Sequence, residues 1–99
     1  MLIVAGTIRV PAENMEAARP AMDELVRATR AEAGCELYAY AEDLFDAGLI
    51  HISERWTDAA SFAAHGAAPH LAEWRVKGAQ LGVHGRDLRL YTVDGFKTL

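Results

Sequence analysis

Two histidines and one carboxylate gather where a predicted strand passes into a predicted helix. Glu54 stands two residues before Trp56 at the end of the strand, and His65 and His70 follow within the next helical turns. A histidine that takes a proton, held in place by a carboxylate, is a common general-base arrangement in enzymes. We therefore predict that His65 or His70 accepts a proton from a substrate and that Glu54 orients the histidine.

Each of these side chains also has a structural interpretation. Glu54 shares a strand face with apolar residues, where a carboxylate must be paired or hydrogen-bonded, so a structural ion pair is the alternative. His65 near a predicted helix end and His70 near a helix start can also be capping or surface histidines. Arg86 can either anchor an anionic oxygen of a substrate or pair with Glu36, Glu42 or Glu54.

Aromatic residues from several parts of the chain predict a crevice between a helix and the sheet. A crevice lined by aromatic rings and a few polar groups is typical of a small-molecule site. Tyr40 adds a further ring beside Tyr38 on the same predicted strand face. The residues that we expect to contact a substrate are Tyr38, Trp56, Phe62, Trp74 and Arg86.

The sequence carries no motif for a bound cofactor or metal ion. It has neither the glycine-rich nucleotide fingerprints nor the G-x-S-x-G nucleophile motif, and it lacks HExxH and CxxC. The spacing of His51, His65, His70 and His84 does not match a set of metal ligands. We therefore expect a site that uses no cofactor and no metal ion.

The composition is that of a small globular protein with an acidic balance. The chain has 99 residues, 52% of them hydrophobic, and a formal net charge of −4. An acidic chain without a basic cluster argues against binding to nucleic acid or to an anionic membrane. The apolar N-terminal run is too short for a signal or transmembrane segment, and Cys35 has no disulfide partner, so we expect a cytoplasmic protein.

Hydrophobic periodicity predicts four strands and the helices between them. The alternating segments are residues 2–10, 35–43, 48–57 and 86–94. Helical patterns cover residues 12–33, the segment from Thr57 or Asp58 to His65, and residues 69–81. Pro20 lies inside the first helical pattern, where it predicts a kink or a new first turn.

These elements follow one another in the order β-α-β-β-α-β. That order is typical of the ferredoxin-like α+β fold, in which a four-stranded antiparallel sheet carries its helices on one face. We expect residues 1–99 to form a single domain of this kind.

Apolar residues on both predicted faces of the sheet indicate a second copy of the chain. On the second strand, Leu37 and Ala39 lie opposite Tyr38 and Tyr40. Helices can cover only one face, and a face left to water should carry polar residues. We therefore predict a symmetric homodimer packed sheet to sheet, with a monomer of unusually apolar surface as the alternative.

Four short segments carry a resemblance to a known family. They are residues 32–38 (EAGCELY), 53–58 (SERWTD), 62–65 (FAAH) and 69–71 (PHL). Their order and spacing resemble the antibiotic biosynthesis monooxygenase (ABM) family, in particular its small quinol-monooxygenase-like branch. The resemblance extends over nearly the whole chain and implies a dimeric α+β barrel.

The resemblance implies a reaction with dioxygen that needs no flavin, metal or haem. The expected substrate is a small aromatic or quinol-type molecule, which once deprotonated can itself pass an electron to dioxygen. Haem-degrading relatives carry an asparagine on the first strand, where this chain has Ala5, Gly6 and Thr7. Two other functions stay open on the same scaffold: a non-catalytic ligand-binding dimer, and a lactone isomerase or other non-redox enzyme.

Overall fold

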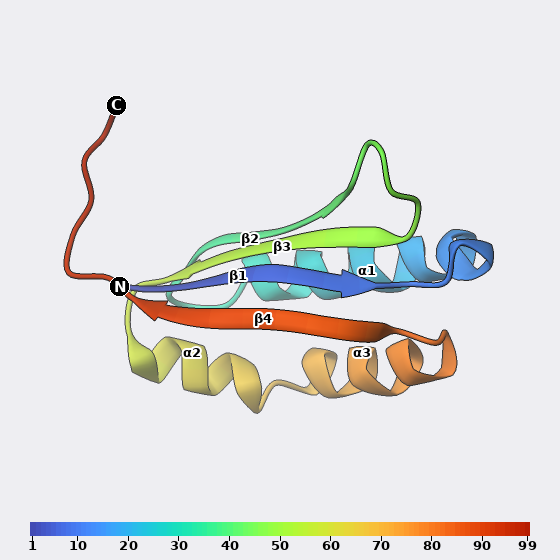
Figure 1. The fold of residues 1–99 in the computed structure, drawn as a ribbon. Coiled ribbons are helices and arrows are strands. Elements are labelled where there is room, and N and C mark those ends of the chain that lie inside the picture. The colour runs from blue at the N-terminus through green and yellow to red at the C-terminus, as the bar shows by residue number, and fades with distance from the viewer.

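The computed structural model describes residues 1–99 as one sheet with its helices packed against it (Figure 1). The strands are β1 (Leu2–Arg9), β2 (Cys35–Glu42), β3 (Leu49–Trp56) and β4 (His84–Thr92). The helices are the 3-10 turn η1 (Ala12–Asn14), α1 (Met15–Arg30), α2 (Ala59–Gly66) and α3 (Pro69–Gln80).

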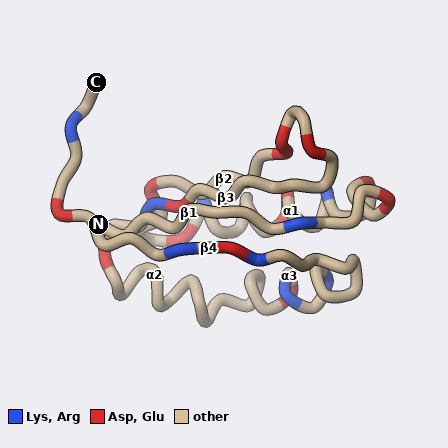
Figure 2. Tube along the Cα trace, viewed as in Figure 1, with Lys and Arg blue, Asp and Glu red and all other residues tan.

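The sheet has the strand order β2-β3-β1-β4, and every neighbouring pair is antiparallel. The first strand therefore lies in the interior of the sheet, between β3 and β4. This arrangement confirms the predicted ferredoxin-like α+β fold, with α1, α2 and α3 packed on one face of the sheet (Figure 1). Figure 2 shows that α2 carries no Lys, Arg, Asp or Glu along its length.

The first helical segment differs from its prediction in two respects. It begins as the 3-10 turn η1 and becomes an α-helix only at Met15. Pro20 does not begin a new helix, because α1 runs from Met15 to Arg30 with Pro20 inside it. Its buried residues recur at three- and four-residue steps and are Met15, Ala18, Met22, Leu25 and Thr29.

The last strand begins two residues earlier than its pattern predicts, at His84 rather than Arg86. Gly85, which precedes the predicted strand, lies within β4 at a φ of 61°. The pairing between β1 and β4 shifts between Thr7 and Arg9, which is the sign of a β-bulge. A bulge interrupts the alternation of side chains, so the sequence pattern alone misplaces this strand start.

The core lies between the sheet and the helices. Its largest fully buried side chains include Trp56, Tyr38, Leu25, Ile50 and Ile52. These residues come from α1, β2 and β3. The core therefore joins the first helix to the half of the sheet that carries the predicted site residues.

The other side of the sheet is not covered by any helix. We call it the open face, and define it by Ile3, Ala5, Leu37, Ala39 and Tyr91, which share one side through the strand register. Leu37 is 38% exposed and Tyr91 is 46% exposed. By the same register Ser53, Arg55 and Arg89 lie on this side, so the open face combines the predicted apolar side chains with polar ones.

Beyond β4, the chain extends away from the sheet as a tail without helix or strand (Figure 1). Phe96 in this tail is 77% exposed, so its ring has no packing partner in a single chain. None of the helices is both long and apolar enough to cross a membrane.

Candidate functional site

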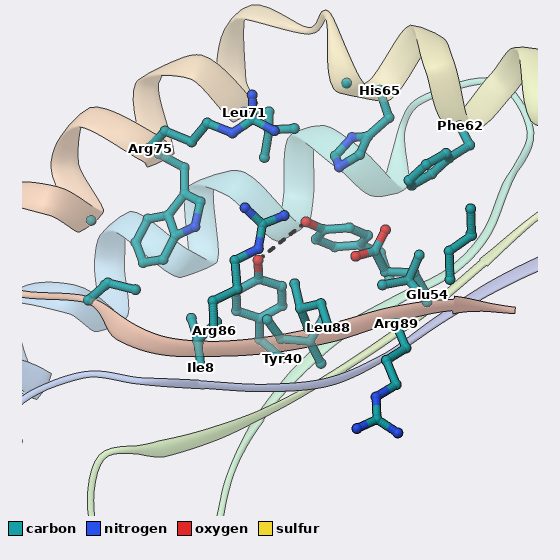
Figure 3. A pocket seen from close by; sticks show the side chains of 18 of the residues that line it. Ile8, Tyr40, Glu54, Phe62, His65, Leu71, Arg75, Arg86, Leu88 and Arg89 are labelled. Atoms are coloured by element: carbon teal, nitrogen blue, oxygen red, sulfur yellow. Dashed lines mark hydrogen bonds between the residues drawn. The ribbon is translucent and has the colours of Figure 1, made fainter.

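A cavity of about 460 Å³ lies between the sheet and the helices α2 and α3 (Figure 3). Hydrophobic residues make up 12 of the 20 that line it. The volume falls within the roughly 300–1,000 Å³ that is usual for small-molecule sites. Of the eight residues that the sequence predicts for the site, six line this cavity: Tyr38, Glu54, Phe62, His65, Trp74 and Arg86.

His65 is the polar group of the cavity best placed to accept a proton. It lies in the last turn of α2, is only 4% exposed, and points from the helix into the cavity (Figure 3). Its Nδ1 is 2.7 Å from Oε2 of Glu32. An ionised carboxylate can only accept, so Nδ1 carries a proton, and in the neutral imidazole Nε2 then keeps a free lone pair. The imidazole is thereby fixed in the tautomer that suits a general base.

The same carboxylate oxygen also holds His70. Nε2 of His70 is 2.8 Å from Oε2 of Glu32, so one oxygen accepts a hydrogen bond from each imidazole. His70 lies in the first turn of α3 and does not line the cavity. The structure therefore places His70 behind the site, where it helps to fix Glu32, whereas His65 faces the cavity.

Glu32 is the site residue that sequence reasoning missed. It lies in the turn between α1 and β2, where the Cys35 N–H donates to the Glu32 carbonyl at 3.3 Å. The side chain is 16% exposed. Its only signal in the sequence is its place in the EAGCELY segment, because it lies 33 positions from His65 and no local pattern links the two.

The start of α2 is fixed by the predicted cap. The Asp58 side chain accepts from the backbone N–H of Ser61 at 2.8 Å. This hydrogen bond holds the pKa of Asp58 below its usual range. Because the cap fixes where the helix begins, it also fixes which side of α2 His65 occupies.

Glu54 does not contact His65 through a hydrogen bond, in contrast to the predicted orienting role. Its Oε1 accepts from the indole Nε1 of Trp56 at 3.0 Å. Burial raises the pKa of Glu54, and the indole hydrogen bond only partly opposes that effect. The contact expected of Glu54 is made by Glu32, and Glu54 is instead a buried carboxyl on the wall of the cavity.

Trp56 lies behind the cavity rather than in it. It is fully buried and does not line the cavity. Its ring is centred 4.9 Å from the ring of His65 and 6.2 Å from the ring of Phe62. Trp56 thus supports the histidine, while Phe62 and Trp74 provide the aromatic wall that the sequence predicts.

Two tyrosines from β2 form a polar patch on the floor of the cavity. The hydroxyls of Tyr38 and Tyr40 are 3.4 Å apart (Figure 3). Burial raises the pKa of both, strongly for Tyr38 and to about 12 for Tyr40. Both therefore remain neutral phenols at neutral pH and can donate a hydrogen bond to a ligand. Tyr40, which the sequence places among the rings of the crevice but not among the substrate contacts, also lines the cavity.

Arg86 reaches the cavity from β4 without an ion pair. The sequence offered Glu36, Glu42 and Glu54 as partners. Glu36 pairs with Arg55 and Glu42 with Arg19, while Glu54 accepts from Trp56. The guanidinium of Arg86 is therefore free to meet an anionic oxygen.

The histidines do not form the four-residue metal set considered from the sequence. His51 pairs with Asp43 at 2.7 Å, and Nδ1 of His84 lies 2.9 Å from the Gly82 carbonyl. The residues with the right donor atoms for a divalent ion are Glu32, His65 and His70, whose donor atoms all lie within 4.8 Å of one another. In this structure Nδ1 of His65 and Nε2 of His70 both direct their N–H groups at the same carboxylate oxygen of Glu32.

Comparison with protein families identifies one match. The model of the family described as antibiotic biosynthesis monooxygenase matches residues 1–77. The matched part contains Glu32, Glu54, His65, His70 and the cavity-lining residue Trp74.

Individual proteins that resemble this chain share its fold closely but its sequence only distantly. A structure from Deinococcus radiodurans, provisionally named an antibiotic biosynthesis monooxygenase, is 28% identical with a TM-score of 0.92, covering 100% of this chain and 98% of that one. A Mycobacterium tuberculosis structure is 23% identical with a TM-score of 0.77, covering 98% and 96%. An uncharacterized protein of Synechocystis sp. is 24% identical over 99% of this chain and 67% of its own length.

Proposed function

Because the chain belongs to the antibiotic biosynthesis monooxygenase family, we propose that it oxygenates a small aromatic, quinol-type substrate with dioxygen in the cavity beside His65. The family and the names of its structural neighbours support a monooxygenase-type function. The observation that carries the finer proposal is the Glu32–His65 pair, which presents a free Nε2 to a mainly apolar cavity.

The first step is transfer of a proton from the substrate to His65. A phenol, or the methylene group of an anthrone, gives its proton to Nε2. The resulting imidazolium is stabilised by the carboxylate of Glu32, which already accepts from Nδ1 at 2.7 Å. His70 donates a hydrogen bond to the same oxygen of Glu32 and keeps the Glu32 side chain in position.

The second step uses the electrons of the substrate itself. The carbanion or phenolate passes an electron to dioxygen, and the two radicals combine to form a peroxide. Cleavage of the O–O bond then leaves one oxygen atom on carbon and releases the other as water. For a methylene carbon the balance is R₂CH₂ + O₂ → R₂CO + H₂O, so no further reductant is required.

The cavity wall supports both steps. Phe62 and Trp74 enclose an aromatic ring and exclude water from the reactive intermediate. Tyr38 and Tyr40 can donate to a developing oxyanion, because burial keeps them protonated. Glu54 retains its proton to a higher pH than an exposed glutamate, and can return a proton to the peroxide as the O–O bond breaks.

The proposal includes a homodimer formed through the open face. Leu37 and Tyr91 expose apolar surface there, and a symmetric partner is the simplest cover for such a face. Each protomer contributes the single domain of residues 1–99. A cytoplasmic location is also part of the proposal, and the unpaired Cys35 supports it, because disulfide-free proteins suit a reducing compartment.

Oxygen uptake with dihydroquinones and anthrones tests the proposal. The wild-type protein should consume dioxygen faster than the uncatalysed background, and both His65→Ala and His65→Gln should fall to background. His51→Ala is the matched control, since His51 is exposed and bonds to Asp43 away from the cavity. Circular dichroism establishes that each variant is folded. Wild-type uptake at the background rate with every substrate would overturn the proposal.

The same assay separates the two other functions. Turnover of a substrate under nitrogen would identify a non-redox enzyme such as an isomerase. Stoichiometric binding of an aromatic ligand without turnover in air would identify a ligand-binding module.

A further inference from the structure

Two arginines at the cavity have no partner in the protein. The chain has ten lysine and arginine residues, and seven of them bond to a carboxylate or a carbonyl. The three without a partner are Arg75, Arg86 and Lys97. Arg75 and Arg86 both line the cavity, whereas Lys97 lies in the C-terminal tail.

The cavity is therefore more cationic than the protein as a whole. The chain carries a formal net charge of −4, yet Glu54 is the only acidic residue that lines the cavity. Glu54 is 6% exposed and directs Oε1 to the Trp56 indole rather than to either arginine. Arg89 also belongs to the lining, but its side chain points away from the cavity and lies 3.6 Å from Asp87 (Figure 3).

The two free guanidinium groups come from opposite walls. Arg75 extends from α3, and Arg86 rises from β4 beside Tyr40 (Figure 3). His65 and Phe62 enter from α2, further along the helix layer (Figure 3). A guanidinium presents paired N–H donors that match the two oxygens of a carboxylate. The site thus offers a cationic end and an aromatic end that holds the base.

We propose that the substrate is an aromatic acid whose carboxylate is bound by Arg75 and Arg86 while its reacting phenol or quinol ring lies beside His65. This inference rests on the proposed function for the reaction and goes beyond it by naming the substrate class. The carboxylate does not take part in the redox chemistry, so the balance of the oxygenation is unchanged. Its purpose is to fix which end of the ring meets the base.

The test compares 1,4-dihydroxy-2-naphthoate with its methyl ester. The two probes share the quinol ring and differ in the negative charge. Because a hydrogen bond to a charged group is worth more than one to a neutral group, we expect kcat/KM for the acid to exceed that for the ester by about 10- to 100-fold. A ratio near one in the wild-type protein would overturn the proposal.

Variants assign the preference to the two arginines. Arg75→Met and Arg86→Met should each lower the acid-to-ester ratio by about three- to tenfold, and the double variant should bring it close to one. Arg75→Lys keeps the charge but loses the paired donors, and should retain part of the preference. Lys97→Met removes the third unpaired cation and should leave the ratio unchanged. An unchanged ratio in the double variant would overturn the proposal.

Binding under nitrogen separates this inference from the proposed function. Quenching of tryptophan fluorescence, to which Trp74 in the cavity wall should contribute, reports binding without turnover. Tighter binding of the acid, lost in the double variant, would support the arginine site even if neither probe consumed dioxygen. Equal turnover of acid and ester would support the monooxygenase and contradict the arginine site.

Discussion

At the residue scale, the chemistry of the site depends on one carboxylate oxygen that serves two imidazoles. Oε2 of Glu32 lies 2.7 Å from His65 and 2.8 Å from His70. When His65 takes a proton, the new positive charge forms next to an existing negative charge, in a position from which water is mostly excluded. Such an arrangement lowers the free-energy cost of forming the imidazolium.

Replacing the carboxylate should therefore slow the reaction more than it weakens binding. Glu32→Gln keeps the shape of the side chain but removes its charge, so the imidazolium loses its partner and the tautomer of His65 is no longer fixed. We expect kcat to fall by about 100-fold with a much smaller change in KM. Glu42→Gln is the control, because Glu42 is an exposed partner of Arg19. Equal kcat values for Glu32→Gln and the wild-type protein would contradict the assigned role.

Glu54 should make the stability of the fold depend on pH. Its pKa in the folded protein is raised by burial above the ordinary value of about 4.3. As the pH rises, Glu54 therefore ionises in the unfolded chain before it ionises in the folded protein. The neutral carboxyl contributes fully to the free energy of unfolding below pH ~4.3, and this contribution is lost as the pH rises through the pKa of Glu54 in the folded protein. Glu54→Gln cannot titrate but keeps an oxygen that can accept from Trp56.

Urea unfolding at pH 4 and pH 7 measures this difference. The free energy of unfolding of the wild-type protein, relative to Glu54→Gln, should be lower at pH 7 than at pH 4. A difference that is constant, or that grows in favour of the wild-type protein, would show that burial does not raise the pKa of Glu54.

The site could be predicted from the sequence only as far as local patterns reach. His65 and Glu54 do share one cavity, because strand alternation and the helix after it determine where each side chain points. Glu32 could not be found in this way, since its contact with His65 depends on how the turn after α1 meets α2. Nor could the absence of an ion pair at Arg86 be predicted, since it depends on the pairing of Glu36 with Arg55 and of Glu42 with Arg19.

At the scale of elements, the break between α2 and α3 brings the two histidines together. His65 ends one helix and His70 begins the next, and Ala68 N–H donates to the His65 carbonyl at 3.0 Å between them. In a continuous helix, two residues five positions apart would point to different sides of the helix. The Pro69 start of α3 therefore contributes directly to the geometry at Glu32.

The position of β4, which carries Arg86, depends on a glycine in β1. A Cβ at Gly6 would lie 1.8 Å from the backbone oxygen of Asp87, and a backbone atom cannot move aside as a flexible side chain can. Gly6→Ala should destabilise the fold by about 2–4 kcal/mol and displace β4 from β1. Gly66→Ala is the control, because nothing lies within 4 Å of its Cβ position and alanine favours a helix by roughly 0.5–1 kcal/mol.

Thermal and urea unfolding measure both glycine variants. An equal or higher midpoint for Gly6→Ala than for the wild-type protein would contradict the close packing of the two strands.

Most element bounds could be predicted from periodicity, because alternation and helical stripes record burial directly. The start of β4 could not, because a bulge beside Gly85 breaks the alternation.

At the scale of the whole molecule, the open face is a surface that no helix of the chain covers. Its apolar side chains could be predicted from the sequence, because successive residues of a strand point to opposite faces of the sheet. Which surface a second copy would cover cannot be read in that way, since it depends on the packing of all four strands. Leu37 and Tyr91 lie on strands at opposite edges of the sheet, so a partner must span its full width.

A charge placed on the open face should separate the protomers. Light scattering coupled to gel filtration should give twice the 10.8 kDa chain mass for the wild-type protein. Leu37→Glu should shift the mass toward one chain, because an interfacial carboxylate would be buried without a partner. Val76→Glu, at a 60% exposed apolar position on α3, should leave the dimer intact. A monomeric wild-type protein would contradict the dimer.

The central claim is that His65, held by Glu32, removes a proton so that the substrate reacts directly with dioxygen. Mass spectrometry of the product formed from anthrone under ¹⁸O₂ tests it most directly. The account predicts one ¹⁸O atom in the new carbonyl group with the wild-type protein, and product formation at the background rate with His65→Ala. A product without ¹⁸O, or equal rates for the two proteins, would contradict the account.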